Sequence, residues 1–213
     1  MDGMLYQINP HFLYNTLDNM FMLARINGDE RMGKLIQALS SMLRISLNKG
    51  AEYVTVRQEL AHARAYLDIQ KIRYGPLFDY TVFCGDDAGD CLITKLILQP
   101  IVKNCIKYGF SGMAAGGRID IRAEREGGHI ALTVKNNGAP ISGDAAEKLN
   151  AMKDMEIQDM RTLFDSPKGG FGLYNVVSRL KLRYGKDFEL RYEALEEGGT
   201  RCALLIPIRD EAG

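Results

Sequence analysis

The sequence predicts an α+β protein, with helices in its amino-terminal part and short strands alternating with helices in the remainder. Apolar residues recur with the 3.6-residue period of helices as far as Gly75-Pro76. Beyond that point they alternate in short runs, which is typical of half-buried strands. We therefore expect a helical hairpin in residues 1–52 and an α/β domain in residues 53–213. The third helix connects the two or begins the second.

Each of the three predicted helices carries one apolar stripe. The stripes are Leu13, Leu17, Met20 and Ala24; Leu35, Leu39, Met42 and Ser46; and Val56, Leu60, Ala63 and Leu67. Asn27-Gly28-Asp29 predicts the first turn, and Thr55 with Gln58 predicts a capping box on the third helix. A two-helix hairpin cannot bury both of its stripes, so we expect two copies to pair as a four-helix bundle.

The second part contains the pattern of a mixed α/β domain. The expected strands are 78–84, 118–124, 130–135, 188–194 and 202–208, and the expected helices are 94–108, 144–152 and 173–184. Gly127-Gly128 and Gly198-Gly199 predict the turns of two hairpins. Residues 153–170 have little periodicity and several charges, which predicts a mobile loop.

Composition excludes several classes of protein. Lysine and arginine total 27 against 27 aspartates and glutamates, so no excess positive charge is available for a nucleic-acid partner. The four cysteines show neither zinc-ligand nor disulfide spacing and are expected to be buried thiols. No apolar run is long enough to cross a bilayer. A dense motif follows Met1 almost at once, so we expect a piece of a longer protein.

His11 is the first candidate functional residue. Helical spacing places it nearly opposite the first apolar stripe, on one face with Asn15 and Asp18, so its imidazole should face solvent. Asn15 could hold the ring by a hydrogen bond. A neutral imidazole is a good nucleophile toward a phosphoryl group. A surface histidine is also commonly without any role, and its position alone leaves both interpretations open.

The surrounding run favours the first interpretation. Residues 7–17, QINPHFLYNTL, resemble the H-box of the LytS/YesM-type sensor histidine kinases almost letter for letter. This resemblance implies that His11 is autophosphorylated and then passes its phosphoryl group to an aspartate of a response-regulator receiver domain.

Further motifs of the same family follow in its order. Residues 98–109, LQPIVKNCIKYG, resemble the N-box, in which Asn104 would bind Mg²⁺ and Lys107 could approach the phosphates. Residues 132–140, LTVKNNGAP, stand where the G1 box belongs, with Asn136 and Gly138 at the adenine. Residues 170–185, GFGLYNVVSRLKLRYG, resemble the G2 box and the helix that follows it, and the glycine-rich loop here begins at Lys168. Thr200 follows a final pair of glycines. The remaining nucleotide-site candidates in these motifs are Tyr108, Lys168, Gly170, Gly172 and Leu173.

The resemblance implies a Bergerat-type ATP-binding fold of the GHKL ATPases, an α/β sandwich with helices on one face of a mixed sheet. Residues 153–170 would be the lid over ATP. It also implies a homodimer joined by the amino-terminal helices, and a cytoplasmic location in a membrane sensor whose other segments precede Met1.

Four residues depart from the family's motifs. Lys103 stands where a glutamate usually polarises the attacking group, and Tyr108 stands in place of a histidine. Asn136 replaces an aspartate, and Pro140 replaces a glycine. Asn136 can still accept a hydrogen bond from the adenine amino group, but this bond is weaker than one to the charged carboxylate of an aspartate. Lys103 cannot take a proton, but it could stabilise the γ-phosphate.

Two functions are therefore weighed. The first is a protein-histidine kinase in which ATP, Mg²⁺, Asn104 and Lys103 act on His11. The second is a degenerate signalling and dimerisation module with weak or no phosphotransfer. An ATPase or a serine kinase on the same fold would not require the Asn-Pro-His-Phe run.

Overall fold

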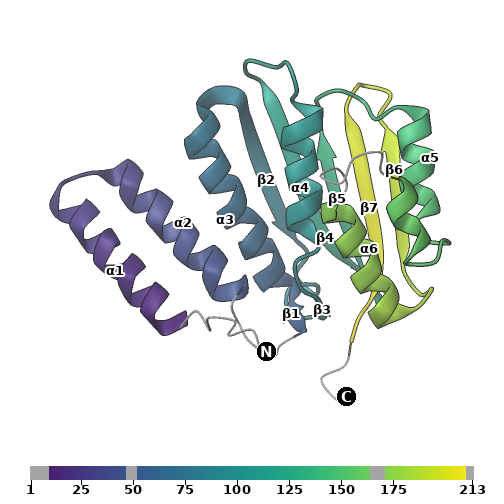
Figure 1. Cartoon of the computed structure of the whole chain (residues 1–213), viewed down its shortest axis with the longest axis horizontal. Coiled ribbons are helices and arrows are strands. Elements are labelled where there is room, and N and C mark those ends of the chain that lie inside the picture. Colours follow the sequence, from purple (N-terminus) through teal and green to yellow (C-terminus); the bar gives the residue numbers. More distant parts are fainter. Residues whose placement is uncertain (1–9, 47–51, 164–170, 210–213) are drawn as a thin grey trace, which may run out of the picture.

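Helices and strands form separate layers in the computed structural model, which describes residues 10–46, 52–163 and 171–209. The helices α3, α4, α5 and α6 cover one face of a five-stranded sheet, and the hairpin of α1 and α2 leans against α3 at the opposite end from α5 (Figure 1). No helix within these residues is long and apolar enough to cross a membrane. The α+β class and the one-sided sandwich are confirmed.

Helices α1 (Pro10–Ile26) and α2 (Glu30–Ser46) form the predicted hairpin around residues 27–29. Leu17 and Ala24 of α1 pack against Ile36 of α2 in a small cluster. Met20 is 49% exposed, so its place in the predicted stripe is wrong. The buried face of α1 runs through Leu17, Phe21 and Ala24, and Met20 lies beside it.

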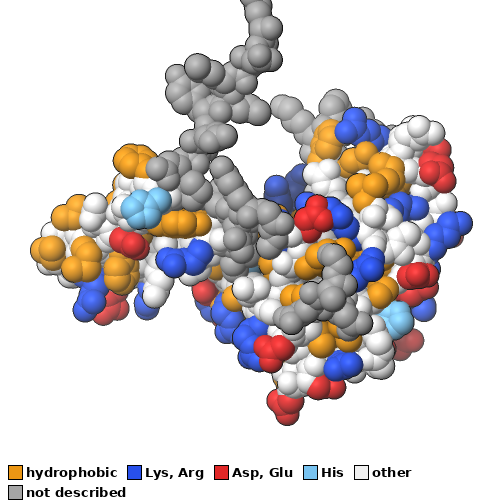
Figure 2. Space-filling model, turned by 90° about the horizontal axis from the view of Figure 1, so that it is seen from below, with side chains coloured by type: hydrophobic (Ala, Val, Ile, Leu, Met, Phe, Trp, Pro, Cys, Tyr) orange, Lys and Arg blue, Asp and Glu red, His pale blue; other side chains and the backbone are white. Residues whose placement is uncertain are grey.

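A hydrophobic surface remains on this hairpin. Figure 2 shows apolar side chains gathered over the lobe formed by α1 and α2. The most exposed large ones in this lobe are Phe12, Met20, Met22, Leu23, Ile26 and Met32. We call this set the α1 apolar surface. It exceeds what isolated surface residues explain and indicates a contact with another protein surface.

Helix α3 (Val56–Tyr74) begins at the predicted capping box. The Thr55 hydroxyl accepts from the Gln58 N–H, and Gln58 Oε1 accepts from the Thr55 N–H at 2.9 Å. All four residues of its predicted stripe are buried. The strand β1 (Tyr53–Thr55), just before it, pairs antiparallel with β3 (Leu92–Thr94). These two short strands were not predicted.

The main sheet has the strand order β2-β4-β5-β7-β6. Its strands are β2 (Phe78–Cys84), β4 (Gly117–Glu126), β5 (His129–Asn136), β6 (Glu189–Ala194) and β7 (Thr200–Pro207). Strand β2 pairs parallel with β4 and the other pairs are antiparallel, so the sheet is mixed as predicted. Inward residues alternate along β4 and β5 and form the core with α3, α4 and α6.

The helix predicted at 94–108 begins later than expected. Thr94 belongs to β3, and α4 runs from Leu98 to Asn104 before a π-helical turn at Cys105–Gly109. Pro100 therefore lies in the first turn, where a helix needs no donor from it. Helices α5 (Gly143–Ala151) and α6 (Phe171–Tyr184) fall where predicted.

The four cysteines were expected to be buried thiols. Cys105 and Cys202 are buried, whereas Cys84 and Cys91 are only partly buried.

Candidate functional site

His11 lies on the outer face of α1. Its imidazole is exposed, and Asn15, one turn later, lies within hydrogen-bond distance, 3.3 Å from Nδ1 to Nδ2. The Asn15 Nδ2–H group can only donate, so the bond forms in the tautomer whose Nδ1 is unprotonated, and it then fixes the ring relative to the helix. Asp18 is exposed on the same side of α1. The structure therefore presents His11 to solvent, as its spacing predicted.

A cavity of about 540 Å³ opens beside α4, between the ends of β5 and β7 and the helix α5. Its size falls within the range of small-molecule sites. Five predicted site residues line it: Asn104, Tyr108, Asn136, Leu173 and Thr200. The rest of the wall is mainly apolar, contributed by residues such as Ile101, Val134, Ile141, Leu149 and Leu163.

The polar groups deep in the cavity are uncharged. Burial raises the pKa of the Cys105 thiol to about 12 and that of the Cys202 thiol to about 12. Burial also raises the pKa of Tyr192 well above its usual value, next to these two thiols. Asn136, only 5% exposed, adds a neutral amide. A flat, neutral heterocycle such as adenine suits this floor better than a charged group would.

Asn136 is held by close-packed glycines. Its Oδ1 accepts from the Gly138 N–H at 3.0 Å, and its Nδ2 donates to the Thr200 carbonyl at 3.4 Å. A Cβ on Gly109 would lie 2.7 Å from Asn136 Oδ1, and one on Gly199 would lie 1.9 Å from the Asn136 carbonyl oxygen. The glycines are required so that three backbone segments can meet around this amide. One lone pair of Oδ1 remains for a ligand.

Thr200 shapes the cavity through its hydroxyl. This group accepts from the Ile141 N–H at 2.9 Å and donates to the Ala139 carbonyl at 3.3 Å. It thereby holds the segment that leads from β5 into α5, which forms one wall of the cavity. Gly138, by contrast, does not line the cavity. A Cβ there would lie 2.1 Å from the Gly109 carbonyl oxygen, so the residue serves packing.

The polar residues of α4 and its π-helical turn lie at different depths. Asn104 and Tyr108 line the cavity, whereas Lys103 and Lys107 are exposed and are not part of its wall. Lys107 Nζ donates to the Tyr108 hydroxyl at 2.9 Å and lies 4.7 Å from the ring centroid. The lysine therefore reaches the rim of the cavity through Tyr108.

The start of α6 packs against α4. A Cβ on Gly172 would lie 3.1 Å from Pro100 Cβ, and the next residue, Leu173, reaches the cavity wall. Within the predicted lid, residues 153–163 are described and end in a 3-10 helix, Asp159–Leu163. Arg161 of this helix lies over the Tyr174 ring at 5.1 Å. Lys168 and Gly170, both predicted in the site, lie outside the described residues.

Several lining residues were not predicted. Cys105, Cys202 and Tyr192 form the deep part of the cavity, and Lys148 of α5 stands on its wall. An alternating strand pattern shows which residues of β6 and β7 face inward but not which of them meet a cavity. Lys148 reads as an ordinary exposed helix residue in the sequence, so no local signal could have found it.

The residues present fit a nucleotide with a divalent cation. The apolar walls and the neutral floor suit a base, and the Asn104 amide can supply an oxygen ligand from the side. The described residues contain no group of three His, Cys, Asp or Glu side chains that could hold a metal. A cation in this cavity would accordingly take most of its ligands from phosphate oxygens and water.

Comparison with known proteins gives the class. Residues 89–210 match the family described as histidine kinase-, DNA gyrase B-, and HSP90-like ATPase, and residues 1–78 match the histidine kinase family. The solved histidine kinase domain from Erythrobacter litoralis EL346 covers 93% of this chain with a TM-score of 0.51 at 18% identity. The fold is thus that of this class of ATPases, and the chain belongs to it.

Curated relatives narrow the family. The sensor histidine kinase YesM of Bacillus subtilis is 33% identical over 205 residues, which are 96% of this chain and 33% of YesM. The sensor histidine kinase/phosphatase LytS of Staphylococcus aureus is 31% identical over 208 residues, 96% of this chain and 34% of LytS. The chain belongs to the sensor histidine kinases, and it spans about a third of the length of these relatives.

One further solved structure shares the fold. Full-length ShkA, solved in complex with AMPPNP, has a TM-score of 0.53 at 15% identity and covers 96% of this chain and 45% of its own. At that identity the match shows the shared fold alone.

Proposed function

We propose that this chain is the catalytic core of a two-component sensor histidine kinase. In this proposal His11 accepts the γ-phosphoryl group of ATP and passes it to an aspartate of a response-regulator receiver domain. The main observation behind this proposal is that one chain contains an exposed imidazole and a cavity of nucleotide size with Asn136 in its floor. Family membership supports both halves of the proposal.

Each residue of the site has a separate role in this proposal. Asn136 Oδ1 accepts from the adenine amino group, and Ile101, Ile141 and Leu173 enclose the ring. Asn104 anchors Mg²⁺, which neutralises charge on the phosphates when bound. An imidazole nitrogen of His11 forms a bond to the γ-phosphorus as the bond to the bridging oxygen breaks, and ADP leaves. Asn15 keeps the ring aligned for this attack.

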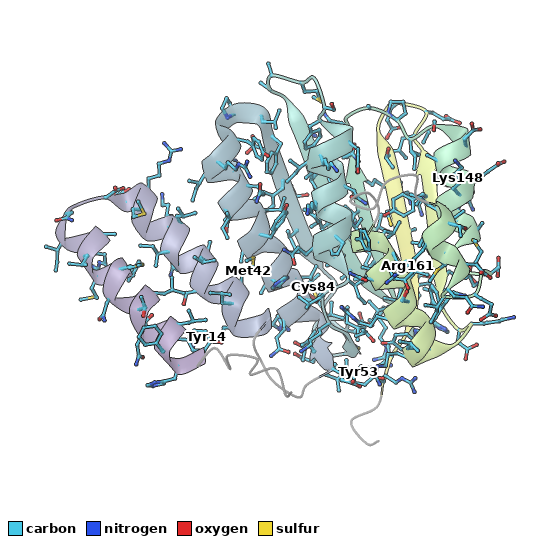
Figure 3. All side chains as sticks on the ribbon, viewed as in Figure 1. Tyr14, Met42, Tyr53, Cys84, Lys148 and Arg161 are labelled. Atoms are coloured by element: carbon cyan, nitrogen blue, oxygen red, sulfur yellow. The ribbon has the colours of Figure 1, made fainter. Side chains whose placement is uncertain are left out.

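The separation of the two sites sets a requirement. Tyr14, one turn after His11 on α1, and Lys148 of the cavity wall lie at opposite ends of the molecule (Figure 3). Helices α2 and α3 lie between α1 and α4, which carries Asn104, so in this arrangement the imidazole does not face a phosphate bound beside Asn104 (Figure 1). Transfer therefore needs the ATP-binding domain of a partner subunit, or a rotation of the residues 53–213 relative to the hairpin.

The α1 apolar surface supports a homodimer. Burying these side chains against a second copy would complete the four-helix bundle and remove the exposed patch from water. The length of the relatives supports our further proposal that the chain is the cytoplasmic portion of a membrane sensor. A receiver domain is then the protein partner of His11, and nucleic acid is not expected to bind.

Incubation with γ-labelled ATP and Mg²⁺ tests the kinase. We expect an acid-labile, base-stable label on the wild-type protein, because phosphohistidine has that stability. His11→Gln should abolish the label, and the matched change His129→Gln, on the β4–β5 hairpin, should retain it. Unlabelled wild-type protein beside a well-labelled relative would contradict the proposal.

A second candidate is a degenerate signalling module that dimerises but transfers no phosphate. Lys103 favours it, because an exposed cation stands directly before Asn104 where the family has a proton acceptor. Lys103→Glu discriminates between the two functions. A large gain in labelling would show that the lysine limits catalysis, whereas a loss would show that this protein uses the cation on the γ-phosphate.

A further inference from the structure

Helix α4 begins without a cap of its own. Its N-cap residue, Ile97, has no side-chain hydrogen bond to offer, and the residue before it, Leu96, has a φ of +61°. Leu96 is the single non-glycine residue with positive φ among those that the structure describes. Such a backbone persists only where its surroundings hold it in place.

Glu59 of α3 supplies the missing cap from another element. Its carboxylate is fully buried and accepts three backbone N–H groups, those of Leu96 at 2.8 Å, Ile97 at 2.6 Å and Leu98 at 2.8 Å. Burial raises the pKa of Glu59, and the three donors together with Arg179 oppose this rise. All of the donors thus converge on one side chain, which fixes the start of α4 to α3.

Arg179 of α6 holds the same turn from the opposite side. Its guanidinium donates to the Lys95 carbonyl at 2.5 Å and to the Leu96 carbonyl at 3.3 Å. The N–H of Leu96 therefore binds α3 and its carbonyl binds α6. Two turns before Arg179, Gly172 packs on Pro100 of α4. Helices α4 and α6 are thereby joined at two points along their length.

Helix α4 leads from this turn directly to Asn104. Helix α4 has seven residues, from Leu98, directly after Ile97, to Asn104, and a helix this short transmits the placement of its first turn to its last. Any change in the Glu59 and Arg179 contacts should therefore displace Asn104. Most of the adenine floor comes from the sheet, through Asn136, Tyr192 and Cys202, while α4 and its π-helical turn add Ile101 and Cys105.

We propose that Glu59 and Arg179 are positioning residues for the nucleotide site, which fix the Leu96 turn and through it set the place of Asn104 beside the cavity. This role rests on the proposed function. It predicts that loss of either side chain weakens the contact with the metal and phosphates more than it weakens the adenine contact. A residue needed only for stability would affect both contacts together.

Calorimetry on the full chain separates these cases with two probes, adenosine alone and a non-hydrolysable ATP analogue with Mg²⁺. We expect Glu59→Gln and Arg179→Gln to weaken binding of the analogue roughly tenfold, as loss of a supporting partner commonly does, with less than about a twofold change for adenosine. Glu124→Gln and Arg122→Gln, on the uncovered face of β4, are matched controls that should change neither affinity.

A double substitution gives the decisive measurement. In an Asn104→Ala background, Glu59→Gln should weaken the analogue no further, because its effect passes through Asn104. Equal losses for both probes, unchanged affinities, or additive losses in the double variant would overturn the positioning role. Should Glu59→Gln not fold, Arg179→Lys, which keeps one donor, should give the same selective loss at smaller size. Wild-type protein that binds neither probe would overturn the proposed function together with this role.

Discussion

Two glycines near the cavity form a matched pair of substitutions. A Cβ on Gly138 would lie 2.1 Å from the Gly109 carbonyl oxygen, whereas a Cβ on Gly143 would meet nothing within 4 Å. Gly138→Ala must push the Asn136 segment away from Gly109, so we expect a loss of about 1–3 kcal/mol in the free energy of unfolding. Gly143→Ala should be neutral or stabilising by up to about 1 kcal/mol.

Denaturant unfolding of the two variants measures this difference. Gly138→Ala should also weaken nucleotide binding, since the same movement displaces the Asn136 amide. Equal stability of the two variants would show that the backbone at Gly138 adapts to a side chain. The packing role would then be wrong, and the role in adenine binding that the motif implies would be favoured.

His62 gives the stability of the protein a pH dependence. The side chain is fully buried on α3, and burial lowers its pKa below the usual 6.5. As the pH falls, His62 is therefore protonated in the unfolded chain at a higher pH than in the folded protein. Its contribution to stability is fully present above pH 6.5 and is lost as the pH falls through the lower pKa of the folded protein. The slope from this group reaches at most about 1.4 kcal/mol per pH unit. His62→Met should flatten it, as unfolding measured between pH 7.5 and 5 would show. Parallel curves for the two proteins would contradict the assignment.

The side chain of Asn150 hydrogen-bonds helix α5 to the edge of the sheet. Asn150 Nδ2 donates to the Tyr192 carbonyl at 3.0 Å, and Asn150 Oδ1 accepts from the Tyr192 N–H at 2.6 Å. The amide thus pairs with the edge strand β6 as a neighbouring strand would. Asn150→Ala removes both bonds and should cost roughly 1–3 kcal/mol in unfolding free energy.

The loss should extend to binding, because α5 carries the cavity wall around Ala145 and Leu149. Asn150→Asp keeps the acceptor and loses the donor, and it should fall between the wild type and Asn150→Ala in both unfolding and nucleotide affinity. A stable Asn150→Ala variant with unchanged affinity would show that apolar contacts alone hold α5 to β6.

The elements were predictable where their patterns are local. Clean alternation placed β2 at Phe78–Cys84, and the Thr55 capping box placed the start of α3. The start of α4 was predicted wrongly because it depends on distant residues: Glu59 lies 37 residues from Leu96 and Arg179 lies 83 residues from it. Glu59 interrupts the apolar face of α3, and this was the one sequence signal for such a contact.

In the candidate site, too, residues in local motifs were predictable and residues brought together only by the fold were not. The motifs placed Asn104, Tyr108, Asn136, Leu173 and Thr200, which all line the cavity. They could not place the thiols of Cys105 and Cys202 or the hydroxyl of Tyr192, which meet only when β6, β7 and the π-helical turn pack together. The roles of the predicted residues in binding and phosphotransfer stay predictions.

Assembly of the whole protein depends on the α1 apolar surface. Ile26 is 76% exposed on α1, and Leu182 is 74% exposed on α6, so the two residues are similarly exposed apolar side chains in different places. If α1 joins two copies, Ile26→Glu places two charges in the interface of a symmetric dimer and also removes two buried side chains. Each buried isoleucine contributes roughly 1.5–3 kcal/mol, so dimer affinity should fall by on the order of a hundredfold or more.

Sedimentation equilibrium of wild type, Ile26→Glu and Leu182→Glu measures this directly. The wild type and Leu182→Glu should both be dimers at micromolar concentration, and Ile26→Glu should dissociate without loss of helix content. A dimer that only Leu182→Glu disrupts would place the interface on α6. In that arrangement no partner subunit would complete the helical bundle, and His11 could receive phosphate only through rotation of the ATP-binding domain of its own chain.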